Sequence, residues 1–358
     1  MRVHDVLPVE ETAQRSLTAA WERVMCNGAS SLTTDLALRP AVRASWTRAL
    51  QRGVKPALAR APQLLDDTSL AERRDAVDWL PMAEQVVRTQ ASGAVLDGHI
   101  LALFDERAHM LAATGDPRAL DGLADINFRP GAVWSEDAVG TNGPGTALAT
   151  GRAVHIVGAE HFCARWQGWH CAAAPVRDPL TREVIGVLDL SGFRERAHPH
   201  TLSLVTAIAV ALEQRLATRE AERRVTLLRQ FGALVGRYPA DAILVVDRAG
   251  EIIAASSAAE RLVKRLQASG QEAADALRAL STDGPGRDRS ARWEAPTHGL
   301  MREASHPLVG GMATVHAMHD GRTAIGASLV LPAARHGVAR PPGPVSYTHL
   351  RAHETKAN

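Results

Sequence analysis

The spacing of apolar residues alternates between helical and strand-like along this chain, and this alternation restricts the possible folds more than any other feature. From His99 onward short apolar runs alternate with polar turns, and the runs at residues 99–105 and 110–114 predict a β-hairpin. Further strands are predicted at residues 153–157, 169–176 and 184–190. In the last of these both alternating sets of side chains are apolar, so both faces should be covered, by helices on one side and a pocket on the other. This part of the chain predicts an α+β domain.

Helical spacing dominates before His99 and returns after Pro199. The first 90 residues predict helices at residues 10–25 and 40–52, and a third helix that starts at a capping box, Ser69-Leu70-Ala71-Glu72. After Pro199 one long helix is predicted, whose apolar residues follow coiled-coil spacing.

That long helix carries two apolar stripes, which are offset from each other as after a stutter. The first stripe consists of Leu202, Val205, Ala209, Leu212 and Leu216, and the second of Ala221, Val225, Leu228 and Val235. We expect the first stripe to join two copies of the chain in a homodimer. The alternative is that it packs on the sheet of its own chain.

A second, smaller α+β domain is predicted after the long helix. Its strands are expected at residues 243–247, 252–255, 313–318 and 324–331, with a loop at Ser281 to Ser290. Residues 334–344 are rich in proline, as in a linker. The tail, residues 345–358, differs in composition from the rest and resembles translated adapter sequence, so we expect the native chain to be cut near Pro344 and exclude the tail from fold reasoning.

Composition excludes several classes of protein. The 41 lysines and arginines nearly balance 39 acidic residues, so the chain lacks the concentrated basic surface of a dedicated nucleic-acid binder. Three cysteines are too few for a disulfide framework, which suits a reducing compartment. There is no signal peptide and no apolar stretch long enough for a membrane span. We expect a cytoplasmic protein without membrane contact.

Six short stretches occur in order between about residue 39 and residue 216. They are Arg43 to Arg48 with Gly53 to Pro56; Trp134 to Glu136 with Gly140 to Asn142 and Gly145 to Leu148; Gly158 to Phe162; Trp169 to Pro179; Gly186 to Gly192; and His198 to His200. Together they resemble the N-terminal sensory region of sigma-54-dependent transcriptional activators of the acetoin-catabolism regulator type. At Gly143-Pro144 the chain departs from this pattern, although proline is tolerated at the start of a helix that Gly151 would close.

The resemblance implies a GAF domain with a central antiparallel sheet flanked by helices. Asp247, Gly250 and Ala258-Ala259 look like the opening of a PAS domain. The implied organisation is a helical segment at residues 1–90, a GAF-like domain at 91–197, a linking helix at 198–235, a PAS-like domain at 236–333, and a linker and tail at 334–358.

The implied function is sensing of a small-molecule effector by the regulatory part of an activator, without enzymatic activity. No phosphate-binding loop of the Gly-x-x-x-x-Gly-Lys-Ser/Thr type occurs in the chain. Contacts with DNA and sigma-54 polymerase would therefore require modules that this sequence does not contain.

The ligand site is expected between the sheet and the loop that precedes the helix at residue 144. Its candidate residues are Trp134, Glu136, Asn142, Thr146, His161, Trp169, Cys171 and Asp189. Backbone amides at this helix start would suit an anionic ligand, whereas the alternative is an ordinary turn with a helix cap. No catalytic residue, cofactor or metal ligand is assigned.

Two other functions remain open. His161, Cys163, His170 and Cys171 are residue types that bind metals or undergo redox chemistry. However, neighbours on a strand point to opposite sides, and an i, i+2 pair on a helical turn does not share a face. A buried thiol and a capping histidine are therefore the preferred interpretation over a metal or redox sensor. The third possibility is the sensory part of a histidine kinase or a cyclic-nucleotide enzyme.

Overall fold

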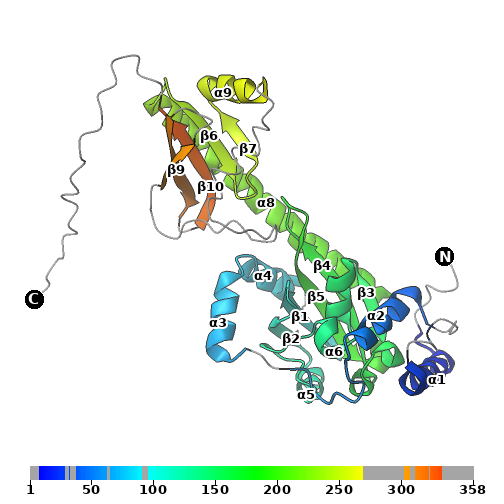
Figure 1. Cartoon of the computed structure of the whole chain (residues 1–358). Coiled ribbons are helices and arrows are strands. Elements are labelled where there is room, and N and C mark those ends of the chain that lie inside the picture. Colours follow the sequence, from blue (N-terminus) through cyan, green and yellow to red (C-terminus); the bar gives the residue numbers. More distant parts are fainter. Residues whose placement is uncertain are drawn as a thin grey trace, which may run out of the picture. The chain divides into compact units, whose positions relative to one another are not determined.

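The structure is a computed structural model that describes residues 8–28, 32, 38–62, 65–90, 96–268, 302–306, 311–321 and 323–332. Contacts divide the chain into two compact units, Met1–Glu222 and Arg223–Asn358 (Figure 1). The predicted loop at Ser281 to Ser290, the proline-rich segment and the tail lie outside the described residues.

The first unit is built on a five-stranded antiparallel sheet. Its strands are β1 (His99–Asp105), β2 (Met110–Gly115), β3 (Val154–Val157), β4 (Trp169–Arg177) and β5 (Val184–Phe193). Their order in the sheet is β2-β1-β5-β4-β3, so β1 pairs with its hairpin partner β2 on one side and with β5 on the other. The predicted hairpin and the three further strands are confirmed.

Helices cover both faces of this sheet. One face packs on α4 (Leu80–Gln90) and the first part of α8 (Pro199–Arg237) through a core that includes Leu101 and Leu188. The other face packs on α1 (Glu11–Asn27), α2 (Pro40–Gln51), α5 (Pro117–Ala124) and α7 (Gly143–Thr150). The second face, where the sequence predicts a pocket, carries a packed core of tryptophan, phenylalanine and aliphatic side chains.

Side-chain caps define two helices next to this core. Asn142 accepts a hydrogen bond from the Gly145 amide at the start of α7. Gly151 ends the helix in a left-handed conformation, which confirms the predicted end of this helix. The capping box at Ser69 is wrong. Helix α3 (Asp67–Ala76) begins three residues earlier than a Ser69 cap would place it, because the Asp66 carboxylate accepts the Ser69 amide and takes the N-cap position.

Helix α8 is continuous over 39 residues, which confirms the long helix. The first stripe on it does not form an exposed seam. Val205, Ala209, Leu212 and Leu216 are buried within the first unit, in the same core as the sheet residues Leu188 and Leu190. The prediction of a dimer through this stripe is therefore corrected: its apolar side chains already pack on the sheet of their own chain.

The second unit contains another five-stranded antiparallel sheet. Its strands are β6 (Ala242–Asp247), β7 (Ile252–Ala255), β8 (Arg302–His306), β9 (Gly311–Asp320) and β10 (Thr323–Leu331), and α9 (Ser257–Ala268) follows β7. The order β7-β6-β10-β9-β8 repeats the order of the first sheet, counted from the first strand of each. The four predicted strands are confirmed, and β8 is additional. Among the helices of the described residues, none combines the length and apolar character needed to cross a membrane.

Candidate functional site

Glu136 and Thr146 both lie next to Ser45, a residue of the N-terminal helix α2. Glu136 opens α6 (Glu136–Val139), and its carboxylate is 5% exposed. It accepts hydrogen bonds from the Ser45 hydroxyl and from the Arg48 guanidinium, whose Nε lies 2.6 Å and Nη2 2.9 Å from its two oxygens. The hydrogen bond with Glu136 raises the pKa of Arg48. The Ser45 hydroxyl also lies 2.6 Å from Thr141 Oγ1 and 3.5 Å from Thr146 Oγ1.

This arrangement fixes α2 onto the loop that the sequence assigns to the ligand. Ser45 and Arg48 belong to the first stretch that carries the family resemblance, but the sequence alone gives them no role. The structure explains their spacing, because residues three apart on a helix lie on one face and can contact the same carboxylate.

Asn142 and Trp134 are engaged within the protein. The Asn142 amide nitrogen donates to the Gly140 carbonyl at 2.7 Å, while its oxygen accepts the Gly145 amide at 2.9 Å. Trp134 is buried, and its ring lies 4.6 Å from that of Phe128 and 5.3 Å from that of Trp166, measured between centroids. These contacts are those of a helix cap and a core aromatic residue.

Cys171 and Asp189 come together beneath the first residue of α7. A Cβ atom at Gly143 would lie 2.6 Å from Cys171 Cβ and 2.7 Å from Asp189 Oδ1, so only glycine fits between them. The Ser191 hydroxyl donates to Asp189 Oδ2 at 2.5 Å, whereas the buried Oδ1 has no hydrogen-bond partner. Burial raises the pKa of Asp189 to about 8, so the carboxyl group is mostly protonated at neutral pH.

His161 and His170 belong to a group of histidines that the sequence does not reveal. On adjacent strands, His170 Nδ1 lies 3.1 Å from Nε2 of His155, and its ring centroid is 5.1 Å from that of His99. Burial lowers the pKa values to about 3 for His155, about 4 for His161 and about 2 for His170. One ring nitrogen on each of these three side chains is buried without a hydrogen-bond partner. The register of β1, β3, β4 and β5 brings His99, His155 and His170 together, with Gly192 of β5 opposite both His99 and His170.

The remaining cysteine and tryptophan candidates are also packed. Cys163 donates to the Val139 carbonyl at 3.2 Å, and burial raises the pKa of its thiol to about 12. Burial likewise raises the pKa of Cys171. Trp169 stacks on Phe193 at 4.7 Å. Within the described part of the chain, no three His, Cys, Asp or Glu side chains are arranged to hold a metal ion.

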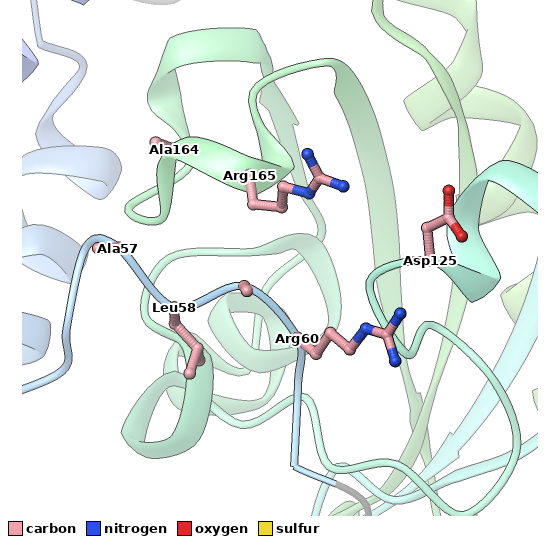
Figure 2. A pocket seen from close by; sticks show the side chains of 7 residues that line it. Ala57, Leu58, Arg60, Asp125, Ala164 and Arg165 are labelled. Carbon is pink, nitrogen blue, oxygen red and sulfur yellow. The ribbon is translucent and has the colours of Figure 1, made fainter.

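A surface pocket of about 410 Å³ lies at a different place, which the sequence does not point to. It is formed by the loop after α2, the end of α5 and the short helix η5 (Ala164–Trp166). Figure 2 shows the side chains of Arg60 and Arg165 extending from separate segments toward the side where Asp125 lies. Its lining residues are Ala57, Leu58, Ala59, Arg60, Asp125, Ala164 and Arg165.

Comparison with known proteins places this sheet and its helices in a family of regulators. An uncharacterized 47.3 kDa protein from the thcA 5′ region of Rhodococcus erythropolis is 38% identical over 185 residues, 52% of this chain and 42% of that protein. The acetoin dehydrogenase operon transcriptional activator AcoR of Bacillus subtilis is 34% identical over 213 residues, 59% of this chain and 34% of AcoR. The propane 2-monooxygenase operon transcriptional activator MimR of Mycolicibacterium goodii is 34% identical over 242 residues, 65% of this chain and 39% of MimR.

The chain thus spans less than half the length of these curated relatives. A solved structure, the complex of Escherichia coli DhaR(N) with DhaL, matches with a TM-score of 0.51 and 21% identity over 84% of this chain and all of that chain, which concerns the fold alone. Residues 13–214 match the family described as MimR, N-terminal domain. The resemblance to the sensory region of acetoin-regulator-type activators is confirmed, and the chain belongs to the MimR N-terminal domain family.

Proposed function

We propose that this chain is the signal-sensing regulatory part of a bacterial transcriptional activator of the sigma-54-dependent type. The observation that carries the proposal is the family match over residues 13–214, joined to relatives that are named operon activators. Contacts with DNA and with sigma-54 polymerase would then be made by modules outside the present sequence. A role next to the polymerase implies a cytoplasmic location.

Within this proposal the first sheet belongs to a GAF-like domain and the second to a PAS-like domain. Support comes from the shared strand order of the two antiparallel sheets. The proposed organisation is a helical segment at 1–90, the GAF-like domain at 91–197, a linking helix at 198–235, the PAS-like domain at 236–333 and a linker with tail at 334–358.

The signal is a small-molecule effector that changes the packing of α8. Side chains of β4 and β5 share a buried core with this helix, and Glu213 on α8 accepts the Arg177 amide at the end of β4 at 2.8 Å. An effector acts in this way only if it binds one packing arrangement more tightly than the other. The eight candidate ligand residues remain a proposal, and access to Glu136 and Thr146 requires α2 to move, because Ser45 lies against both.

We also propose a homodimer, through the second apolar stripe of α8 and not through the first stripe, which is buried in the first unit. In the second unit Val225 and Leu228 are 56% and 48% exposed, although both are apolar. They are three residues apart and so lie on one face of the helix. In light scattering, Val225→Glu should convert the dimer to a folded monomer. A wild-type chain that is monomeric at micromolar concentration would refute the dimer.

The two alternative functions have less support. A redox sensor needs a thiol with a lowered pKa, whereas the pKa values of Cys163 and Cys171 are both raised by burial. A kinase or cyclase front end would share these folds, but the named relatives are operon activators and regulators.

A chimera tests the proposal. The N-terminal region of MimR that matches this chain is replaced by residues 8–332, and transcription from a MimR-dependent promoter is measured with a panel of small metabolites. We expect transcription to rise with one class of metabolite. The same chimera with Leu212→Glu, which disrupts the core under α8, serves as the inactive control. A chimera that accumulates normally but gives the same transcription with every metabolite would contradict a sensory function.

A further inference from the structure

The surface pocket beside α5 has the chemistry of an anion site. Two guanidinium groups, on Arg60 and Arg165, and one carboxylate, on Asp125, line it together with small apolar side chains. All three charged residues are exposed, and none of them forms an ion pair with another described residue. We propose that this pocket binds a small organic anion, one that carries a carboxylate or phosphate group together with a hydroxyl group.

The backbone around the pocket is fixed before a ligand arrives. The Ala164 amide donates to the Pro56 carbonyl at 3.0 Å, and the Ala61 amide donates to the Ile126 carbonyl at 3.0 Å. Asn127 adds a side-chain hydrogen bond to the Ala61 carbonyl at 2.8 Å. Three segments that are distant in the sequence are thereby joined, so the two arginines are presented without a cost for ordering the loop.

The charges select the ligand class. Guanidinium groups are planar forks that bind the oxygens of carboxylates and phosphates in pairs. Asp125 accepts hydrogen bonds and repels an anionic group placed next to it, which favours a hydroxyl group at its side of the ligand and leaves the anionic groups to the two arginines. Leu58 and the alanines contribute a short apolar wall, and a volume of about 410 Å³ suits a small metabolite.

The pocket is connected to the predicted ligand loop through neighbouring residues. Arg165 precedes Trp166, whose ring lies 5.3 Å from that of Trp134. Arg60 lies on the loop that leaves α2, the helix whose Ser45 and Arg48 hold Glu136. Where the anion is taken as the signal, this inference rests on the proposed sensory function. Binding itself is measured on the chain alone and does not depend on that function.

The test is a titration of the full chain at low ionic strength, measured by calorimetry and NMR. The three probes are inorganic phosphate, malate and the uncharged dimethyl ester of malate. We expect saturable binding of malate and phosphate in the millimolar range, with shifts confined to residues 57–61, 125–127 and 164–166, and none with the ester. Arg60→Gln and Arg165→Gln should each weaken binding about tenfold, the loss expected for one charged hydrogen-bonding group. Asp125→Asn should increase the affinity for phosphate relative to the affinity for malate.

Arg118→Gln is the matched control, because it removes the same charge from an exposed position on α5 outside the pocket. It should leave malate affinity within twofold of wild type. Equal loss in Arg118→Gln and Arg165→Gln, equal binding of the ester, or no saturable binding by wild type would each overturn the site. If the titration shows no binding but the chimera responds to a metabolite, the anion site is contradicted and the sensory function stands. If instead the chain binds malate but the chimera does not respond to any metabolite, the anion site stands and the sensory function is contradicted.

Discussion

Glu136 shows how much a single buried carboxylate contributes when its partners come from a different helix. Removing it in Glu136→Ala leaves Arg48 and Ser45 of α2 without their acceptor in a site of low solvent access. We expect unfolding free energy to fall by about 2 to 3 kcal/mol. Chemical denaturation measures this loss.

The ion pair between Arg52 and Asp137 provides a control for Glu136→Ala. Arg52, the residue that follows α2, forms an ion pair at 3.3 Å with Asp137 of α6, but the two side chains are 63% and 61% exposed. Asp137→Ala should change stability by less than about 0.5 kcal/mol, as for other solvent-exposed pairs. Similar losses for Asp137→Ala and Glu136→Ala would show that burial does not set the contribution of this ion pair.

The buried histidines predict a loss of stability in mild acid. The pKa values of His155, His161 and His170 are about 3, 4 and 2 when folded, below the value of 6.5 for the free side chain. As pH falls from 6.5 toward 4, the unfolded chain binds these protons and the folded chain does not, so stability decreases. Asp189 affects stability in the opposite direction in this pH range. Its pKa is about 8 in the folded chain and 3.8 for the free side chain, so its proton is released on unfolding.

These four groups together therefore take up about two protons on unfolding near pH 5, which contributes about 2.7 kcal/mol per pH unit to the slope of stability against pH. Asp189→Asn keeps a neutral group and removes the released proton, so the slope should steepen by about 1.4 kcal/mol per pH unit. Urea unfolding at a series of pH values measures both slopes. A stability that stays flat between pH 6.5 and 4 would contradict the neutral, buried state of the histidines.

At the scale of elements, α8 presents different faces to the protein and to solvent. Leu212 is 1% exposed in the core under the sheet, whereas Val210 on the same helix is 46% exposed. Leu212→Glu should lower the free energy of unfolding by roughly 4 kcal/mol, since it buries an unpaired carboxylate. Val210→Glu should change it by less than about 0.5 kcal/mol. Thermal unfolding of the two variants tests the observed packing. If the stripe that contains Leu212 were exposed for dimer formation, Leu212→Glu would leave the fold intact.

At the scale of the whole molecule, each unit has cores of its own. The cores of the second unit are small and include Leu329 on β10, which is fully buried. Leu329→Ala should therefore lower the temperature of one calorimetric transition, by a loss of about 2 to 5 kcal/mol, and leave a second transition in place. A single transition that shifts as a whole would show that the two units unfold cooperatively.

The sequence by itself determined the local elements of this protein and the family to which it belongs. The hairpin of β1 and β2, the end of α7 at Gly151, and the continuous helix α8 follow from spacing and turn residues, because these signals act between near neighbours in the chain.

Only the tertiary structure decided which partner each face meets. Periodicity shows that Leu212 lies on an apolar stripe, but it does not distinguish a second copy from the chain's own sheet. Strand register brought His155 beside His170, and three separate segments placed Arg60, Arg165 and Asp125 around one pocket. Such groupings depend on contacts between residues far apart in the sequence, and local preferences carry no information about which distant segment will supply them.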